Sequence, residues 1–179
     1  MKFLPSIVQT RINTSLGDMV LAATDQGLAG TWFTDQRHRP EALDFKNVPH
    51  AWPRDDRHPV LLQTAKQLAE YFAGCRTDFD LTYDLWGGTA FQQAVWRVLL
   101  AIPFGQSVTY GAVAHQIGKP AAVRAVGAAV GRNPIGIIVP CHRVIGADGT
   151  LTGYAGGLHR KIALLKLEGT ASVKEFQLN

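Results

Sequence analysis

Short runs of alternating apolar and polar residues occupy the first third of the chain. Three such runs, residues 7–12, 19–23 and 28–33, are separated by turn sequences that contain Gly17 and Gly27. Alternation with a period of two is typical of strands with one buried face, and glycine supplies the positive φ that tight hairpin turns require. The pattern therefore predicts a three-stranded antiparallel meander.

The pattern then changes from irregular to helical. Residues 35–59 carry four prolines and many charges, which favours an irregular segment. Apolar residues at near-helical spacing over residues 60–73, followed by Gly74, predict a helix with its C-terminal stop. Residues 79–85 can add a further strand to the sheet.

A helical periodicity begins after residues 86–88. Thr89 and Gln92 form a capping-box sequence, in which each side chain satisfies a free backbone amide of the other residue. Apolar residues at helical spacing follow as far as Ile102, and Pro103 ends the pattern. The sequence therefore predicts a first helix over about 90–102 and a change of domain just before it.

Two shorter helices are predicted next, over residues 110–117 and 121–130. Thr109 can cap the first helix, and Pro120 suits the start of the second because its missing N–H costs nothing there. Two short helices joined by a turn that contains Gly118 are a helix-turn-helix signature. Antiparallel helix pairs occur in many folds, so this pattern alone does not identify a DNA-binding protein.

The last part of the chain combines a buried segment with a final helix. The apolar run at residues 135–139 predicts a buried extended segment, and residues 159–168 predict a helix. Together the patterns predict an α+β protein. Its parts are a small antiparallel-sheet α/β domain at residues 1–86, a helical domain at residues 87–170 and a tail at residues 171–179.

Composition limits the classes of protein that fit this fold. Hydrophobic residues make up 46% of the 179 residues, which is ample for a packed core. No apolar run approaches the ~20 residues that cross a bilayer, and the N-terminus lacks a secretory signal, so we expect a cytoplasmic protein. The net charge is +4, with eight basic and two acidic residues from Gly87 to Gly169. This imbalance suits a polyanionic partner.

The chain has two cysteines, Cys75 and Cys141. Two distant thiols make no disulfide framework, and no ligand spacing typical of zinc is present, so we expect no metal. Cys141 stands directly before His142 and Arg143, whose cationic forms lower the pKa of a thiol. Cys141 is therefore either a reactive thiol or an inert buried residue beside surface groups, and Cys75 is interpreted as structural.

The predicted helix at residues 121–130 has two contrasting faces. Val123, Val126 and Val130 share one face, which suits packing. The opposite face holds only Ala121, Ala125 and Ala128, together with the long side chain of Arg124. Such a helix is either tightly packed inside the protein or closely applied to another surface, such as a DNA groove. The helix by itself leaves both interpretations open.

Five motifs in this order resemble the O6-alkylguanine–DNA alkyltransferase family. They are Phe104–Gly111 (FGQSVTYG), Arg124–Gly127 (RAVG), Asn133–Pro134 (NP), Pro140–Gly146 (PCHRVIG) and Gly153–Gly157 (GYAGG), and Glu168–Gly169 closes the match. The resemblance covers residues 89–169 without a break, whereas the first 86 residues are similar only in general layout. The chain is most similar to the free-standing bacterial branch of the family.

The resemblance implies transfer of a methyl or small alkyl group from O6 of guanine to Cys141, once per molecule. O4 of thymine is a second candidate position for the alkyl group. In the family, His142 activates the cysteine through a bound water and Glu168 orients His142. Tyr110 meets the base, and Asn133 braces the turn before the active site. The resemblance implies no cofactor.

The family fold is a small α/β domain followed by a winged helix-turn-helix domain that enters the minor groove. This groove is about 6 Å wide, which accounts for the almost bare helix face. Arg124 matches an arginine that fills the gap left by the flipped-out base. The implied DNA-binding residues are Ala121, Arg124, Ala125, Gly127, Ala128 and Arg132.

The implied pocket for the base is formed by Val130, Val144, Tyr154, Ala155 and Gly156. The backbone carbonyls of Cys141 and Val144 accept from the guanine amino group, and the Ala155 amide donates to the base. Ala155 replaces a serine found in some relatives, which changes no backbone contact. Arg143 is expected to brace the two domains through an ion pair. The implied partner is double-stranded DNA carrying O6-alkylguanine, bound by a monomer with no obligate protein partner and no membrane.

Three other classes of protein compete with this interpretation. A non-catalytic sensor of alkylated DNA has the same fold but needs no cysteine at position 141. A plain winged-helix regulator needs no cysteine, histidine and glutamate set, and its recognition helix normally carries polar side chains for the major groove. A cysteine hydrolase requires a base in direct contact with the thiol and an oxyanion hole, and nothing else in the sequence indicates acyl chemistry.

Overall fold

The computed structural model describes residues 7–43, 51–85 and 87–170. The chain divides into two compact units, Met1–Gly87 and Gly88–Asn179. Trp86 at the predicted domain boundary, the predicted tail at residues 171–179 and part of the predicted irregular segment lie outside the described residues.

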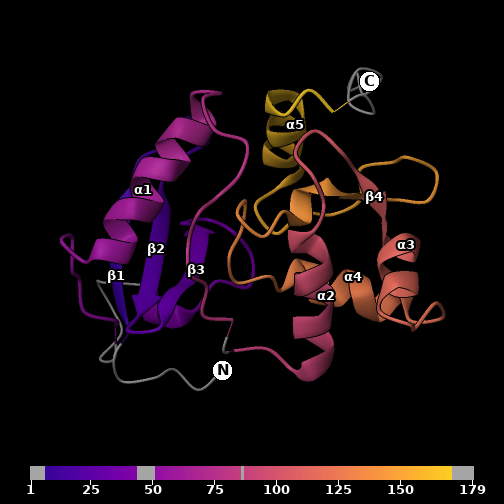
Figure 1. The fold of residues 1–179 in the computed structure, drawn as a ribbon, viewed down its shortest axis with the longest axis horizontal. Helices are drawn as coiled ribbons and strands as arrows, with labels where there is room; N and C mark the ends of the chain where they lie inside the picture. The colour runs from indigo at the N-terminus through magenta and orange to yellow at the C-terminus, as the bar shows by residue number, and fades with distance from the viewer. Residues whose placement is uncertain (1–6, 44–50, 86, 171–179) are drawn as a thin grey trace. The chain divides into compact units, whose positions relative to one another are not determined.

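Three antiparallel strands form the sheet of the N-terminal unit (Figure 1). They are β1 (Val8–Ile12), β2 (Met19–Thr24) and β3 (Gly27–Phe33), paired in the order β1-β2-β3. Every residue of β2 and β3 is buried. The predicted meander is confirmed, with one irregularity of register between Ala22 and Ala23.

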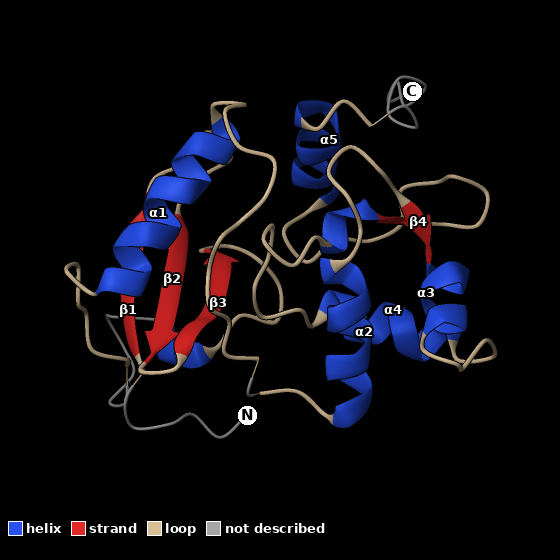
Figure 2. Ribbon diagram, in the orientation of Figure 1, coloured by secondary structure: helices blue, strands red, loops and turns tan. Residues whose placement is uncertain are grey.

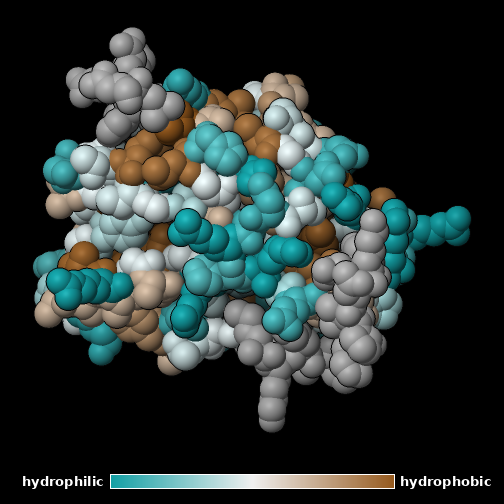
Figure 3. Space-filling view, turned by 180° about the vertical axis from the view of Figure 1, so that it is seen from behind, coloured by the Kyte–Doolittle hydropathy of each residue, from teal (hydrophilic) through white to brown (hydrophobic). Residues whose placement is uncertain are grey.

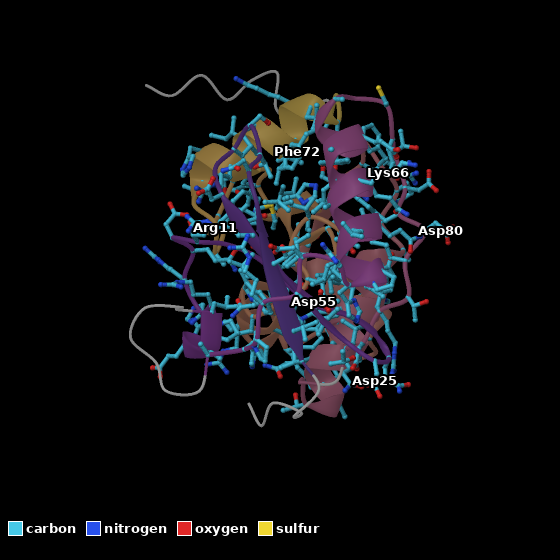
Figure 4. The ribbon with its side chains drawn as sticks, turned by 90° about the vertical axis from the view of Figure 1, so that its left-hand side faces the viewer. Arg11, Asp25, Asp55, Lys66, Phe72 and Asp80 are labelled. Atoms are coloured by element: carbon cyan, nitrogen blue, oxygen red, sulfur yellow. The ribbon has the colours of Figure 1, made fainter. Side chains whose placement is uncertain are left out.

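A single long helix, α1 (Pro59–Phe72), contacts all three strands of this sheet. Its buried side chains include Leu61, Leu68 and Tyr71, as expected for an amphipathic helix. Lys66 points away from the sheet, whereas Phe72 lies on the side of α1 nearer β1 (Figure 4). The helix stops where predicted, because Gly74 follows with a φ of 74°. A short 3-10 helix, η1 (Glu41–Leu43), lies within the predicted irregular segment.

The strand expected at residues 79–85 does not form. This segment makes only an isolated bridge beside β3, in which Leu28 donates to the Thr82 carbonyl at 2.9 Å and accepts from Asp84 N at 2.8 Å. The contact is so close that a Cβ at Gly27 would overlap the Thr82 carbonyl. Two hydrogen bonds are too few for a strand, although the β-type residues do reach the sheet edge.

The C-terminal unit begins with α2 (Ala90–Leu100), and helices account for most of its secondary structure (Figure 2). The capping box is confirmed: Thr89 Oγ1 accepts from Gln92 N at 3.2 Å, and Gln92 Oε1 accepts from Thr89 N at 2.9 Å. The next helix, α3 (Tyr110–Gln116), is capped as predicted by Thr109, whose Oγ1 accepts from Ala112 N at 3.1 Å.

The second helix of the helix-turn-helix starts later than predicted. This helix, α4 (Val123–Gly131), begins after a turn that includes Pro120 and Ala121. The turn is required because Gly118 has a φ of 69° and Lys119 N donates back to the Ala114 carbonyl at 2.9 Å, so the chain must reverse before it can coil again. α4 packs against α2 and α3.

Two very short strands, β4 (Val108–Thr109) and β5 (Val144–Ile145), pair in parallel, and the sequence patterns did not predict them. β5 follows a 3-10 helix, η2 (Cys141–Arg143). The last helix, α5 (Leu158–Leu167), lies within a residue of its predicted bounds and packs against η2.

The apolar run at residues 135–139 is buried as predicted, but it is a turn and not an extended segment. Ile137 has a φ of 72°, and Val139 N donates to the Ile135 carbonyl at 2.9 Å. The side chain of Asn133 replaces a strand partner, since its Oδ1 accepts from Ile135 N at 3.0 Å and its Nδ2 donates to the Val139 carbonyl at 2.7 Å. A run of apolar residues does not reveal such side-chain bonds.

Large hydrophobic side chains are exposed only at scattered positions of the described chain, namely Leu62, Val123 and Leu158. On the face drawn in Figure 3, hydrophobic surface is correspondingly divided into separate patches by hydrophilic surface. Within the described ranges, we find no helix both long enough and apolar enough to span a membrane.

The close approach of Gly88 to Trp96 predicts that Gly88→Ala and Gly131→Ala change the free energy of unfolding in opposite directions. Trp96 is fully buried and its Nε1 donates to the Ala129 carbonyl at 2.9 Å, which ties α2 to α4. A Cβ at Gly88 would overlap the Trp96 ring, so Gly88→Ala should lower the free energy of unfolding by about 1–3 kcal/mol. Gly131→Ala meets no neighbour within 4 Å and should raise it by roughly 0.5–1 kcal/mol. Denaturant unfolding of both variants measures this, and equal effects would contradict the packing argument.

Candidate active site

Cys141 begins the 3-10 helix η2 directly after Pro140, and only 7% of its surface is exposed. Cys141 therefore does not continue an extended segment, because the turn at residues 135–139 leads directly into a helical turn. The amide of Cys141 donates to the Val139 carbonyl at 2.8 Å. The thiol is thus buried, on a backbone fixed by hydrogen bonds.

His142 and Glu168 meet as the resemblance implied. His142 Nε2 lies 2.8 Å from Glu168 Oε1, and both side chains are fully buried. Glu168 follows the last residue of α5, so the end of this helix supplies the carboxylate. The sequence separates the two residues widely, and the packing of α5 on η2 brings them together.

The hydrogen bonds of Glu168 determine the tautomer of His142. Glu168 Oε1 also accepts from Arg143 Nη2 at 3.0 Å, and Oε2 accepts from Arg143 Nε at 2.8 Å and from Gly105 N at 3.3 Å. Because the carboxylate accepts from all these donors, His142 Nε2 is the nitrogen that carries the hydrogen. Neutral His142 therefore has its lone pair on Nδ1, which is buried and has no hydrogen-bond partner among the described residues.

Arg143 does not have the partners that the sequence analysis expected. Its guanidinium pairs with Glu168, donates to the Ile102 carbonyl and lies 5.9 Å from the centre of the Phe104 ring. All these groups belong to the C-terminal unit. The expected brace between domains is therefore replaced by an ion pair inside the site.

Burial and nearby charge act in opposite directions on the Cys141 thiol. Burial raises its pKa and is the largest effect, whereas a hydrogen bond from the Asn133 side chain and the positive charge of Lys161 lower it. Burial also lowers the pKa of His142, against the opposing effect of Glu168, and the charges of Arg143 and Lys161 lower it further. Both groups are therefore biased toward their neutral forms at rest.

Lys161 is a member of this site that the sequence analysis missed. Its side chain is fully buried, and Nζ donates to the Val144 carbonyl at 2.6 Å and to the Thr152 carbonyl at 2.9 Å. Burial lowers the pKa of Lys161 to about 8, although the neighbouring Cys141 opposes this change. Its spacing of two helical turns from Glu168 was the available signal, since it places both residues on one face of the last helix.

Two tyrosines named in the sequence analysis also lie within electrostatic reach of Cys141. Burial raises the pKa of Tyr110, a hydrogen bond with Thr152 lowers it, and the charge of Cys141 raises it again. Burial raises the pKa of Tyr154 well above its usual range, and Cys141 adds to this effect.

The other residues of the expected base pocket lie in the C-terminal unit and are buried or partly buried. Val130, Val144 and Gly156 are buried, and Ala155 is partly buried. Lys161 holds the Val144 carbonyl, and Arg160 Nη1 donates to the Gly156 carbonyl at 2.8 Å. α5 therefore anchors both segments that the pocket requires.

One face of α4 and the turn before it is exposed and nearly bare. The exposed residues include those expected to bind DNA: Ala121, Arg124, Ala125, Ala128 and Arg132. Gly127 is partly buried, and a Cβ there would lie 3.9 Å from the Tyr110 ring. Val126 and Val130 pack inward as predicted, but Val123 is 40% exposed because it begins the helix, where its side chain extends beyond the core.

Cys75 is exposed, so its interpretation as a structural residue is wrong. Its thiol has one hydrogen bond, to the Ala73 carbonyl at 3.7 Å, at the end of α1 where no core is available. Across the described ranges, no three His, Cys, Asp or Glu side chains gather in a way that could hold a metal ion.

The chain is similar to known proteins along most of its length. Residues 7–85 match the family described as 6-O-methylguanine DNA methyltransferase, ribonuclease-like domain, and residues 90–170 match its DNA binding domain. The methylated-DNA–protein-cysteine methyltransferase of Mycobacterium tuberculosis H37Rv is 45% identical, over 93% of this chain and 95% of the relative. The protein of the same name from Methanosarcina acetivorans is 46% identical, over 87% of this chain and 94% of the relative.

A solved structure extends the similarity to the fold. The structure of Mycobacterium tuberculosis OGT in complex with DNA superposes with a TM-score of 0.79 at 44% identity, covering 95% of this chain and 99% of that one. Both family domains are matched in order, and the matched segments together span most of the chain. The chain therefore belongs to the 6-O-methylguanine DNA methyltransferase family.

Proposed function

We propose that this protein repairs alkylated DNA by moving a methyl or small alkyl group from O6 of guanine to the sulfur of Cys141. Membership of the family supports the reaction class. The observation that carries the proposal is the buried Cys141 thiol next to a His142 imidazole that is hydrogen-bonded to Glu168. Each molecule acts once, because the thioether that forms has no leaving group through which the cysteine could be recovered.

The reaction needs a base, because burial keeps the thiol protonated at rest. His142 Nδ1 takes the proton of Cys141 through a bridging water, and the sulfur attacks the alkyl carbon. The carbon–sulfur bond forms as the bond from carbon to guanine O6 breaks, so the electron pair leaves with guanine. Tyr110 and the Ala155 amide stabilise this leaving group by hydrogen bonding to the base, with Asn133 bracing the turn.

Val130 and Tyr154 sandwich the flipped base, beside Ala155 and Gly156. The carbonyls of Cys141 and Val144 accept from the exocyclic amino group, which guanine has and adenine lacks at this position. Lys161 already donates to the Val144 carbonyl, which fixes the direction of that acceptor.

The partner is double-stranded DNA that carries O6-alkylguanine, bound by a monomer. The bare face of α4 allows the backbone to approach the narrow minor groove, and Arg124 fills the space of the flipped base. Arg132, exposed just after α4, adds positive charge toward the phosphates. The sensor alternative is not favoured, because relatives over most of the chain are named as methyltransferases and Cys141 is present.

Alkyl transfer predicts a mass change on one cysteine. Duplex DNA with a single O6-methylguanine should add one methyl group to the wild type, measured by intact-protein and peptide mass spectrometry. Cys141→Ala should gain nothing. Cys75→Ser, which removes the exposed thiol, should react like the wild type. Methylation of Cys75, or tight lesion binding without any mass gain, would contradict the proposal.

The bare face of α4 predicts that bulk, and not only charge, limits DNA binding. Ala125→Gln adds a long neutral side chain and should raise the Kd for duplex DNA by at least about tenfold, or 1.4 kcal/mol. The slope of log K against log salt should stay unchanged, because no phosphate contact is lost. Ala90→Gln, exposed at the first turn of α2, is the matched control and should bind like the wild type. Equal Kd values for all three proteins would disprove the close approach.

The charge of Lys161 predicts a change in thiol reactivity. Lys161→Met removes a charge that lowers the pKa of Cys141, so this pKa should rise. Each unit of rise lowers the thiolate fraction at neutral pH about tenfold. The pH dependence of iodoacetamide labelling, in a Cys75→Ser background, measures this. Lys166→Met, which changes an exposed lysine of α5, should leave the curve in place. Overlapping curves for all three proteins would remove Lys161 from the site.

A further inference from the structure

The Glu168 carboxylate is surrounded by hydrogen-bond donors. It accepts from His142 Nε2 and Arg143 Nη2 on one oxygen, and from Arg143 Nε and Gly105 N on the other. A carboxylate offers about four acceptor positions, so these bonds use the positions available to it. With no position left for a proton of its own, Glu168 can only accept.

Arg143 makes two of these four bonds and is itself held in place. The nitrogens Nε and Nη2 contact the two carboxylate oxygens as a fork, at 2.8 and 3.0 Å. The third nitrogen, Nη1, donates to the Ile102 carbonyl, and the Phe104 ring lies under the guanidinium. Only 6% of Arg143 is exposed. A planar fork of this kind fixes the orientation of a carboxylate, which a lysine cannot do.

We infer that Arg143 is a positioning residue for the proposed alkyl transfer, which clamps Glu168 as a pure acceptor and thereby keeps the lone pair of His142 on Nδ1. The inference rests on the proposed function, in which Nδ1 takes the proton of Cys141. An unclamped carboxylate could rotate or take a proton, and His142 could then turn its Nδ1 hydrogen toward the thiol. In that tautomer it could not act as a base.

The charged groups around His142 determine the direction of the expected effect. Glu168 raises the pKa of His142, whereas burial and the charges of Arg143 and Lys161 lower it below its usual value. A base must be unprotonated, so the transfer rate falls as the pH drops through this pKa. Removing the charge of Arg143 raises the pKa of His142. The acidic limb of the pH–rate profile therefore moves to higher pH.

Single-turnover methyl transfer from O6-methylguanine DNA, measured against pH, tests this inference. In Arg143→Met the acidic limb should move up by about one pH unit. Arg143→Lys keeps the charge but loses the fork, so its limb should stay near that of the wild type while its maximal rate falls. The matched control is Arg160→Met, which removes an equally buried arginine that bonds Gly156 instead of Glu168. The maximal transfer rate of Arg160→Met can fall, but the acidic limb of its pH–rate profile should not move.

A double-mutant comparison tests whether Arg143 acts through Glu168. In a Glu168→Gln background, Arg143→Lys should produce no further fall of the maximal rate, because the carboxylate that the arginine fork orients is already changed. A fall of the maximal rate as large as in the wild-type background would overturn the inference. So would an Arg143→Met protein that transfers methyl groups with the limb of the wild type.

If Arg143→Met does not fold, the tautomer of His142 in the wild-type protein provides the test. Nitrogen-15 NMR of the His142 ring in the wild-type protein should then give a protonated Nε2 and an unprotonated Nδ1 in the neutral form, and the opposite tautomer overturns the inference. The proposed function is tested separately, by methyl transfer to Cys141 in the wild type. If the wild type transfers the methyl group but the acidic limb of Arg143→Met matches that of the wild type, only the proposed role of Arg143 is rejected.

Discussion

The carboxylate of Glu168 joins three segments of the C-terminal unit that are distant in the sequence. Gly105 lies in the loop after α2, His142 and Arg143 lie in η2, and Glu168 directly follows α5. Burying a carboxylate and a guanidinium costs several kcal/mol per ion, and only a close pair with further hydrogen bonds offsets this. The ion pair is therefore a modest source of stability. Its larger consequence is that any arrangement of these segments that separates the charges is strongly disfavoured.

Burial determines the resting protonation states of the site, and the neighbouring charges limit how far burial raises the pKa of Cys141. The Cys141 thiol is less acidic than in water because burial outweighs the effects of Asn133 and Lys161. A protonated thiol of this kind is protected from solutes, in contrast to the exposed Cys75. The same burial makes a nearby base necessary, and His142 is neutral for the same physical reason. Protection and activation therefore come from one environment.

Local signals predicted local structure well. The alternating runs predicted the three strands, and the side chains of Thr89 and Thr109 predicted two helix starts, because a cap involves only residues one turn apart. The resemblance to a family supplied the pairing of His142 with Glu168. The partner of Arg143 was not predictable, since it depends on how α5 packs against η2, and the only sequence signal for the burial of Lys161 was its spacing from Glu168. Charged residues are usually exposed, so residue type alone predicts an exposed Arg143 and an exposed Lys161, whereas both are buried.

The missed turn at residues 135–139 bears on the chemistry as well as on the fold. Ile137 adopts a left-handed conformation that costs about 1–3 kcal/mol, and the hydrogen bonds of Asn133 offset this cost. An extended segment would direct the amides of Cys141 and His142 sideways toward a neighbouring strand. In the 3-10 turn that follows residues 135–139, these amides instead lower the pKa of the thiol, as does the side chain of Asn133. The departure from the predicted backbone is thus what gives the sulfur its donors, and Asn133 serves the fold and the thiol through the same side chain.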